Sequence, residues 1–453
     1  RDTDKPDTDT SVSLSRQFKF FLPLIGTSLL MMITHSLFNA ALARLPSPAV
    51  YISAFAVAKS VVNLLKSPIT MVRQTVSSLV GDKESYHKVR NFFVIFTSAI
   101  ILFIAFIALS NLSSWIFKNI MGIKGETLEK AVVILKVLMV IPLVESLRNI
   151  FQGIAIKYDK TPLFTVATGV RIIYVFLVIR YIDQLLSIMS GAVLAGFLLL
   201  GAISVESLII LLGVKFSIGD MNENIIEAED NDINSPEKGN LNYKMIFMFF
   251  YPLSITSILR FLNGPIINMG LARTVSPEIA LSSYAVGWGL GLILISPLFM
   301  FHQVPINFVG YKGYQNIKSI KKFGIILASI MTLIFGIISF SRVGMYILTS
   351  WIGATEEISI LALDVLKIMT IYPFIRLGKE FYWGLLMKKQ KTKYISRARM
   401  MGILTLVSSV ILLTWIQLPN PATVGVLSII FSHIVEWVYL LKVTRKFKLA
   451  LPS

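Results

Sequence analysis

The 453-residue sequence contains no cysteine and only four histidines, and charged residues make up only 15% of it. Without cysteine there is no disulfide, thiolate metal site or cysteine nucleophile. An enzyme of the membrane would need clustered acids, histidines or a nucleophile with its base. The histidines are instead scattered (His35, His87, His302 and His433), and no Walker loop is present. We therefore expect no enzyme, no transport ATPase and no bound cofactor or metal.

What the sequence has is hydrophobic residues, which form 55% of the chain and come in long runs. The segments Phe92–Ile116 and Phe323–Phe340 contain no charge at all. A run of about 18 or more apolar residues is long enough to cross a bilayer as a helix. A soluble domain of this size would need more charge to cover its surface. The sequence thus predicts an all-α polytopic membrane protein with about twelve transmembrane helices.

Hydropathy sets the expected boundaries of these spans. Six are predicted in each half of the chain, at residues 18–43, 50–79, 91–116, 127–156, 162–182 and 189–214, and then 244–272, 278–309, 322–345, 357–387, 400–417 and 422–441. The domains follow from these: a tail over 1–17, a six-helix bundle over 18–216, an acidic linker over 217–242, a second six-helix bundle over 243–441, and a basic tail over 442–453.

The net charge of +18 raises the question of nucleic acid, but the bases lie in short loops between hydrophobic runs. Lys83, Lys88 and Arg90 follow the second predicted span, and Lys388 and Lys389 follow the tenth. Basic loops of this kind stay on the cytoplasmic side. We expect a multi-pass protein of the cell (plasma or inner) membrane with both termini cytoplasmic, lipid as a partner, and no nucleic-acid partner.

An internal repeat relates the two halves. Phe20-Phe21-Leu22-Pro23-Leu24 recurs as Phe249-Phe250-Tyr251-Pro252-Leu253, and Asn39 and Arg44 recur as Asn268 and Arg273, all at one constant offset in the numbering. Further along, the offset is slightly larger, as in Pro142, Gly153 and Lys157, which recur as Pro373, Gly384 and Lys388. Because each half holds an even number of spans, the copies share one orientation and form a parallel repeat. Two such halves can enclose a cavity and rock for alternating access, so a monomer is expected to suffice.

At these residues the sequence resembles the MATE-like multidrug, oligosaccharidyl-lipid and polysaccharide exporter superfamily, and within it most closely the progressive ankylosis (ANK) family. The resembling stretches include Phe20–Leu24, Ser67-Pro68, Arg260–Asn268 (RFLNGPIIN), Arg376–Lys391 and the last span around Glu436. The resemblance implies two six-helix bundles and export of anions such as citrate, pyrophosphate or nucleotides. Related branches extrude drugs or flip lipid-linked sugars.

The first span departs from that family pattern. Family members similar to this chain carry acids there, whereas this sequence has Met31-Met32-Ile33-Thr34-His35. The resemblance therefore does not carry a coupling-cation site over to this segment.

Ionisable residues inside spans are costly and are the first candidates for function. In the second span Lys59, Lys66 and Arg73 are spaced by seven, with Asn63 between them. Seven residues are nearly two helical turns, so this spacing predicts a column of positive charge on one helix face that leads an anion through. The alternative is that Lys59 and Arg73 extend toward opposite surfaces and only Lys66 lies deep.

Charged pairs are predicted in two equivalent spans. Arg376, Lys379 and Glu380 lie together in the tenth span, and Glu145 and Arg148 lie in the fourth. Intrahelical pairing offsets much of the cost of burying these charges, and a substrate or coupling-ion role is the alternative to a purely structural one.

Two further spans offer candidate site residues. Arg260, with Asn263 and the helix-loosening Pro265 beyond it, is expected to lie near the midplane and to bind substrate or act in gating. Glu436, three residues after His433, is a candidate for a coupling Na⁺ or H⁺, with a hydrogen bond between helices as the alternative.

The balance of these charges suggests the substrate. Bases within the predicted spans outnumber acids there, and excess positive charge in a low-dielectric cavity attracts anions. We therefore expect a secondary transporter that exports a small anion. The alternatives are a flippase for pyrophosphate-linked lipid sugars and a cation-coupled multidrug antiporter. The bases are Lys59, Lys66, Arg73, Arg148, Arg171, Arg260, Arg376 and Lys379, and the acids Glu145, Glu206, Asp364, Glu380 and Glu436.

Overall fold

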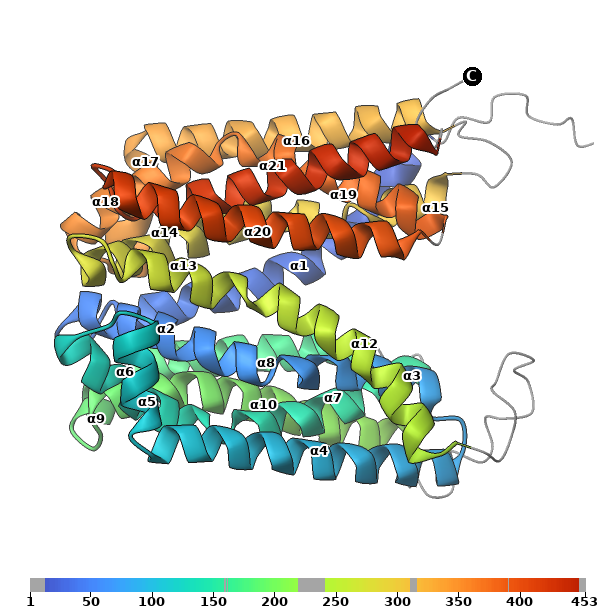
Figure 1. Ribbon diagram of the computed structural model, residues 1–453, viewed down its shortest axis with the longest axis horizontal. Helices are drawn as coiled ribbons and strands as arrows, with labels where there is room; N and C mark the ends of the chain where they lie inside the picture. Colours follow the sequence, from blue (N-terminus) through green and yellow to red (C-terminus); the bar gives the residue numbers. More distant parts are fainter. Residues whose placement is uncertain are drawn as a thin grey trace, which may run out of the picture. The chain divides into compact units, whose positions relative to one another are not determined.

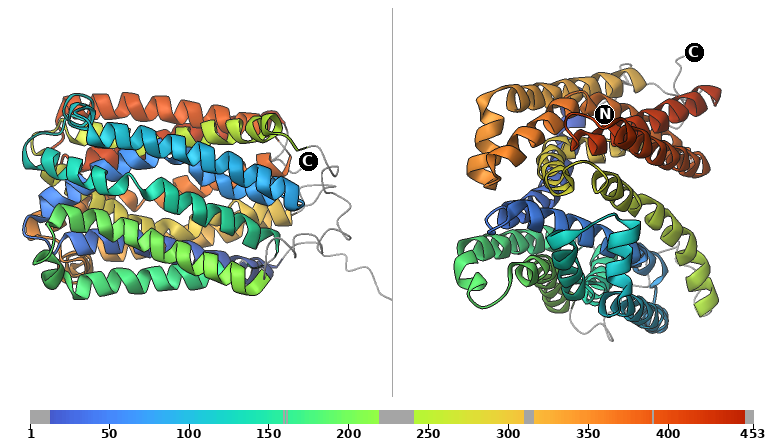
Figure 2. Two further views of the ribbon diagram at one scale, coloured as in Figure 1. Left: turned by 90° about the horizontal axis from the view of Figure 1, so that it is seen from below. Right: turned by 60° about the vertical axis from the view of Figure 1, so that its left-hand side comes forward.

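The computed structural model describes residues 13–158, 160, 162–218, 241–309, 316–389 and 391–447, and over these residues it contains helices and no strand (Figure 1). The predicted all-α class is confirmed. Residues 1–12 of the predicted N-terminal tail, 219–240 of the predicted acidic linker and 448–453 of the predicted C-terminal tail lie outside the described residues. Within each of the two units into which the chain divides, the long helices lie side by side (Figure 2).

The helices of the first half are α1 (Leu14–Leu42), α2 (Pro48–Leu65), η1 (Ser67–Met71), α3 (Val72–Leu79), α4 (Lys83–Leu109), α5 (Leu112–Trp115), η2 (Ile116–Ile120), α6 (Gly125–Leu138), α7 (Ile141–Lys157), α8 (Pro162–Arg180), α9 (Ile182–Leu186) and α10 (Gly191–Ile218). Those of the second half are α12 (Tyr243–Phe261), α13 (Asn263–Leu271), α14 (Pro277–Ile295), η4 (Ser296–Met300), α15 (Gln303–Phe308), α16 (Ile317–Phe340), α17 (Arg342–Tyr346), η5 (Ile347–Ile352), α18 (Glu356–Met369), α19 (Tyr372–Lys388), α20 (Thr392–Ile416) and α21 (Thr423–Lys446).

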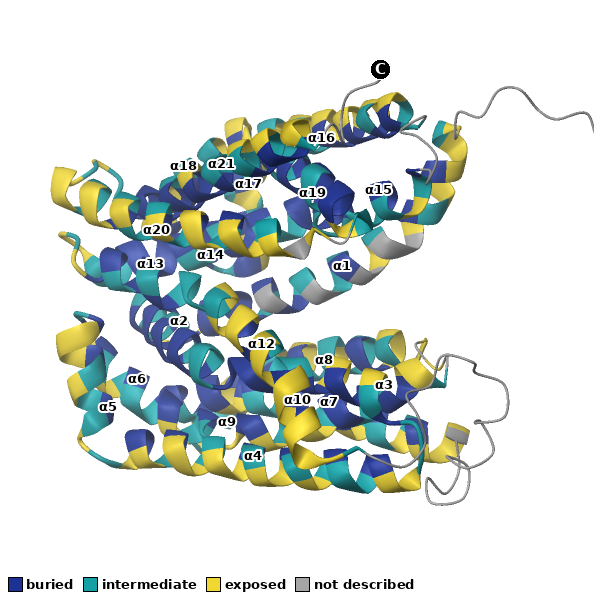
Figure 3. Cartoon of the chain, turned by 45° about the vertical axis from the view of Figure 1, so that its right-hand side comes forward, coloured by how far each residue is buried: buried dark blue, intermediate teal, exposed yellow. Residues whose placement is uncertain are grey.

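Among the described residues, nine helices are long and apolar enough to cross a membrane, and the bent pair α18–α19 brings the number to ten. Each predicted span corresponds to one helix or to a set of consecutive helices. Large apolar side chains such as Leu102, Phe106, Leu333 and Leu404 stand exposed on the outer faces of α4, α16 and α20 (Figure 3). Rows of exposed apolar residues on long helices are what a lipid environment requires, so the chain is a multi-pass membrane protein.

Several predicted spans are broken, and proline explains where. Proline removes a backbone donor and clashes with the preceding turn, so it fits the first turn of a helix better than the interior, where Pro252 of α12 is an exception. Pro142 and Pro373 stand in the first turn of α7 and α19, directly after the breaks from α6 and α18. Pro68 and Pro297 likewise begin the 3₁₀ segments η1 and η4. The second copy therefore breaks its spans at the same places as the first.

The two compact units do not follow chain order. One unit holds residues 37–285 and 352–354, and the other holds 1–36, 286–351 and 355–453. The first part of α1 thus packs with helices of the second half, where the Phe21 ring lies edge-on to Phe301 and Phe323 at 5.9 and 5.8 Å. Correspondingly, α12 packs with the first half through Phe250, whose ring lies 5.1 Å from that of Phe93. The repeat predicts the boundaries 18–216 and 243–441 for the copies. In packing, the first part of α1 joins the helices of the second half, whereas α12, α13 and the first part of α14 join those of the first half.

The unit of residues 37–285 and 352–354 shows the repeat in its hydrogen bonds. The Asn39 side chain donates to the Ala285 carbonyl at 2.8 Å, and Asn268 donates to the Ala56 carbonyl at 3.1 Å. Donor and acceptor are both displaced by the constant offset that relates the first two spans of each copy. The two bonds are thus copies of one interaction.

Arg44 and Arg273 make a second reciprocal pair of contacts in this unit. Arg44 donates to the Ile352 carbonyl at 3.0 Å, and Arg273 donates to the Ile120 carbonyl at 2.7 Å. Each guanidinium also lies over a glycine of positive φ, Gly353 at 81° and Gly122 at 79°. A side chain at either glycine would be strained in this backbone conformation, so the arginine contacts depend on both glycines.

The start of α4 yields a prediction about stability. Asp82 caps this helix by accepting the Ser85 backbone N–H at 2.6 Å, and the Ser85 hydroxyl accepts the Asp82 N–H at 2.9 Å. We expect Asp82→Ala to destabilise the protein by about 1 kcal/mol, whereas Asp82→Asn retains an acceptor and changes little. Thermal unfolding of the purified protein in detergent measures this, and equal loss in both variants would contradict it.

The same cap has an expected pH dependence. Burial raises the pKa of Asp82, but the hydrogen bonds of Ser85 and the charge of Lys157 lower it by more, so the pKa lies below its ordinary value of 3.8. A depressed carboxyl pKa contributes stability that is present above the ordinary pKa and is lost as the pH falls through the folded value.

Candidate functional site: two buried ion networks

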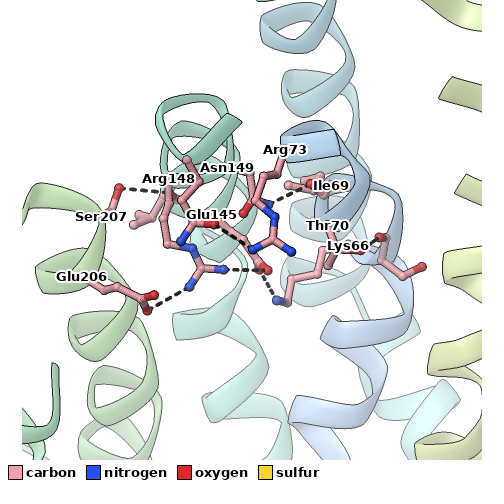
Figure 4. A network of polar contacts seen from close by, with 12 residues as sticks. Lys66, Ile69, Thr70, Arg73, Glu145, Arg148, Asn149, Glu206 and Ser207 are labelled. Atoms are coloured by element: carbon pink, nitrogen blue, oxygen red, sulfur yellow. Dashed lines mark hydrogen bonds and ion pairs between the residues drawn. The ribbon is translucent and has the colours of Figure 1, made fainter. Parts of the chain in front are cut away.

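The first network lies in the unit of residues 37–285 and joins four helices through buried charges (Figure 4). The Lys66 ammonium pairs with the Glu145 carboxylate, and Arg148 contacts the other Glu145 oxygen at 3.3 Å. Arg148 also contacts Glu206 at 3.0 Å, and Arg171 contacts the same Glu206 oxygen at 2.7 Å. Each of the two carboxylates therefore contacts two cations.

The breaks in the spans position this network. Lys66 is the last residue before η1, where Ser67-Pro68 ends the α-helical course of α2. On α7, Glu145 and Arg148 are one turn apart and share a face, as the sequence predicts. Asn149 on the same helix donates to the buried Ile69 carbonyl of η1 at 2.8 Å, which also accepts the Val72 backbone N–H, and this bond ties α7 to the 3₁₀ turn.

The second network lies in the other unit, on α19, α20 and α21. The Lys379 ammonium contacts one Glu436 oxygen at 2.6 Å, and Arg399 contacts the other at 2.9 Å. One turn along α19, Arg376 contacts Glu380 at 2.8 Å, as the intrahelical pairing predicted, and His302 Nδ1 lies 2.7 Å from the second Glu380 oxygen. Both carboxylates again contact two basic groups.

The internal repeat superposes the two networks. Lys379 occupies in α19 the place of Arg148 in α7, at the same offset that relates Pro373 to Pro142. Arg399 corresponds to Arg171 and Glu436 to Glu206 at offsets close to this one, so the triad Arg148–Glu206–Arg171 recurs as Lys379–Glu436–Arg399. A glutamate of the sixth span is thus held in both copies by one base of the fourth span and one of the fifth.

The predicted column of charge on the second span does not form on one continuous helix. The prediction required one α-helix from Lys59 to Arg73, but α2 ends at Leu65 and a 3₁₀ segment follows. Lys59 lies 5.4 Å from the Phe55 ring centroid, Lys66 pairs with Glu145, and Arg73 donates to the Gln152 side chain at 3.4 Å. The three bases therefore have three different surroundings.

The remaining predicted residues lie outside both networks. Asn63 and Asn263 are half-buried, and Arg260 is exposed, with its guanidinium 5.1 Å from the Phe261 ring centroid. His433, which the sequence places beside Glu436, bonds instead to the Tyr372 hydroxyl at 2.8 Å. Glu436 makes contacts to two neighbouring helices, which is the helix-to-helix arrangement that was the alternative to a coupling-ion role.

Four members of the networks were not predicted as site residues: Arg171, Glu206, His302 and Arg399. Glu206 and Arg171 stand singly in long apolar helices, and Arg399 lies near the basic start of α20. The signal that identifies Arg171, Glu206 and Arg399 is their recurrence in the repeat, where Arg171 matches Arg399 and Glu206 matches Glu436 once the offset is allowed to shift slightly between helices. No group of three metal-ligating side chains occurs in the described part of the chain.

Solved structures with the same fold are transporters. The chain is similar to the inward-facing form of a multidrug resistance MATE family transporter of the MOP superfamily, with a TM-score of 0.70 and 17% identity over 94% of this chain and 98% of the other. It is also similar to the eukaryotic MATE transporter AtDTX14, with a TM-score of 0.57 and 11% identity over 96% and 97% of the two chains. The fold is thus that of MATE transporters of the MOP superfamily, as the sequence predicted.

A third structure belongs to a MOP superfamily transporter from Pyrococcus furiosus, whose reported binding pocket has reversed polarity; it covers both chains fully at 15% identity and a TM-score of 0.53. Residues 237–442 match the family model "Progressive ankylosis protein (ANKH)", which confirms the predicted resemblance over the second set of helices. No curated protein sequence matches the chain. These matches show that the fold is that of known transporters and that residues 237–442 are similar to the progressive ankylosis family.

The repeat predicts how the networks respond to substitution. Arg148→Met leaves Glu145 and Glu206 with one cation each, and losing a partner of a buried ion pair costs about 3 kcal/mol. Arg148→Lys reproduces the base that the second copy uses at this place, so we expect it to lose less than half as much. Thermal unfolding in detergent compares the two, and equal destabilisation would show that the triads are not equivalent.

Proposed function

We propose that this transporter exports a small multivalent anion by alternating access. The observation that carries the proposal is the charge of the two networks. Lys66, Arg148 and Arg171 face two carboxylates in one unit, and Arg376, Lys379 and Arg399 face two in the other. With every acid and base charged and His302 neutral, each network keeps one excess positive charge, and such charge in a low-dielectric surrounding attracts anions.

The same contacts argue against export of organic cations. A cation site needs a carboxylate that is available to the substrate. Glu145, Glu206, Glu380 and Glu436 are all buried, and each contacts two basic side chains at once. A cationic drug would have to displace one of these bases and leave it buried without a partner, which costs several kcal/mol.

The comparisons support this choice of substrate class. The progressive ankylosis family matches over residues 237–442, and the Pyrococcus furiosus transporter has a binding pocket of reversed polarity that suggests a different function for it. The resemblance to the former implies citrate, pyrophosphate or nucleotides as substrates. The parallel repeat supports alternating access by one chain, so the proposal needs only a monomer.

Orientation and location form part of the proposal. The basic loops after the predicted second, fourth, eighth and tenth spans support cytoplasmic termini in the plasma or inner membrane. Export then requires that the anion enters from the side of these loops.

Uptake of radiolabelled citrate, pyrophosphate and ATP into proteoliposomes tests the proposal, with and without Na⁺ and pH gradients. We expect saturable uptake of at least one of these anions. Arg73→Gln removes a base whose described contact is an amide and not a carboxylate, so the ion networks stay intact. It should raise the KM for the anion about tenfold, which corresponds to about 1.4 kcal/mol.

Arg90→Gln is the matched control, because it removes one positive charge from α4, where the Arg90 side chain contacts Asn91 and the Tyr86 ring. It should leave the KM at the wild-type value. If the folded protein transports none of the three anions, the anion proposal is wrong, and an assay with a pyrophosphate-linked lipid sugar then tests the flippase alternative.

A further inference from the structure

The two copies of the repeat agree at the triads but differ at positions around them, and at one of these positions a fixed charge corresponds to a titratable group. In the first copy this position holds Arg73, near Gln152 and Asn149. At the offsets that relate these spans, the second copy has His302 in place of Arg73 and Glu380 in place of Asn149. The permanently charged Arg73 and the neutral amide Asn149 thus correspond to two titratable groups, His302 and Glu380.

The pair lies in an equivalent setting in its own unit. Arg73 contacts Gln152 on α7, and the His302 ring stacks on Trp383, which occupies the place of Gln152 on α19, with 5.5 Å between ring centroids and 19° between planes. Arg73 and His302 therefore each contact the equivalent residue of the neighbouring helix, α7 in the first copy and α19 in the second. The difference between them is chemical and not one of placement.

The hydrogen bonds of His302 suit the binding and release of a proton. Its Nδ1 lies 2.7 Å from Glu380 and its Nε2 lies 3.2 Å from the Gln303 amide nitrogen. In this arrangement the neutral ring donates from Nδ1 to the carboxylate and accepts from Gln303 at Nε2. A proton that binds at Nε2 is accommodated when the Gln303 amide turns its oxygen toward the ring. Only one proton is added, and no other group changes its charge.

We propose that His302 and Glu380 form the proton-binding site of this transporter, and that a proton bound there strengthens the binding of the transported anion. The coupling to an anion rests on the function proposed above; the proton site itself does not. Histidine ordinarily changes charge between about pH 5 and 8, so its protonation gives the second copy the positive charge that Arg73 supplies permanently in the first. By linkage, anion and proton then raise each other's affinity.

The charges around the pair support its role in holding a single proton. Glu380 is fully buried and contacts Arg376 at 2.8 Å, so this carboxylate lies between a permanent base and the His302 ring. Lys379, the base nearest along α19, is engaged by Glu436. The other titratable and charged groups on α19 and on the neighbouring helices α16, α20 and α21 are Tyr372, Tyr382 and Lys388 on α19, Lys318, Lys321 and Lys322 on α16, Lys393, Tyr394, Arg397 and Arg399 on α20, and His433, Tyr439, Lys442, Arg445 and Lys446 on α21.

Two substitutions at His302 separate the protonated state from the neutral one. His302→Arg reproduces the first copy and fixes the positive charge, and His302→Gln fixes a neutral side chain. Citrate binding is measured by calorimetry between about pH 6 and 8. Since citrate itself titrates in this range, each variant is compared with wild type at the same pH.

As the pH rises from about 6 to 8, we expect the affinity of the wild type for citrate to fall about tenfold more than that of His302→Arg. The reason is that one proton is linked to anion binding in the wild type. His302→Gln should bind weakly at every pH, and His87→Gln, which changes a histidine near the start of α4, should follow the wild type. If wild type and His302→Arg bind citrate with parallel pH dependence, the coupling is wrong while the anion transporter stands.

Nuclear magnetic resonance of protein labelled with ¹⁵N in its histidine rings tests the site without any anion. The His302 signal, assigned by its loss in His302→Gln, should titrate in this pH range, and Glu380→Gln should shift its midpoint to lower pH because the carboxylate stabilises the imidazolium. A ring that keeps one charge state throughout would overturn the proton site. Titration in a protein that binds no anion would support the proton site and overturn both the coupling and the proposed function.

Discussion

The cost of placing a charge inside a membrane protein constrains every feature of this site. An unpaired charge removed from water costs several kcal/mol, so a carboxylate in a span must be paired and hydrogen-bonded. In the described part of the chain the buried carboxylates Glu145, Glu206, Glu380 and Glu436 are each shared between two basic groups. This sharing ties α7 to α8 and α10 in one unit, and α19 to α20 and α21 in the other. The excess of bases over acids follows directly from it, and the proposed preference for anions follows from that excess.

Duplication explains why the pairing occurs twice. The Arg148–Glu206–Arg171 triad and the Lys379–Glu436–Arg399 triad use the same three helices of each copy, with Lys in place of Arg at one point. At the triads the copies have stayed alike, whereas Lys66 and Glu145 of the first copy correspond to Ile295 and Arg376 in the second. Arg73 and His302 are not members of the triads. At their position the copies differ, with a fixed charge in the first and a titratable group in the second.

Much of the fold could be predicted from the sequence, because apolar runs and a gapless repeat over two spans report directly on helices in a bilayer. The intrahelical pair Arg376–Glu380 was predictable for the same reason, since i,i+4 spacing fixes contact within one helix. The column of Lys59, Lys66 and Arg73 was not, because Pro68 replaces the α-helix by a 3₁₀ turn at Ser67–Met71. The partners of Glu206 and Glu436 come from other helices, and hydropathy contains no information on which helices are neighbours. The packing of the first part of α1 with the second half, and of α12 and α13 with the first half, could not be predicted for the same reason.

The central claim is that the two networks favour an anion over an organic cation, and direct binding tests it most simply. Calorimetry on the purified protein would compare pyrophosphate with tetraphenylphosphonium, at low salt and again at high salt. The account predicts saturable binding of pyrophosphate that weakens as salt screens the excess positive charge, and no binding of the cation. Saturable binding of tetraphenylphosphonium without binding of pyrophosphate would contradict it.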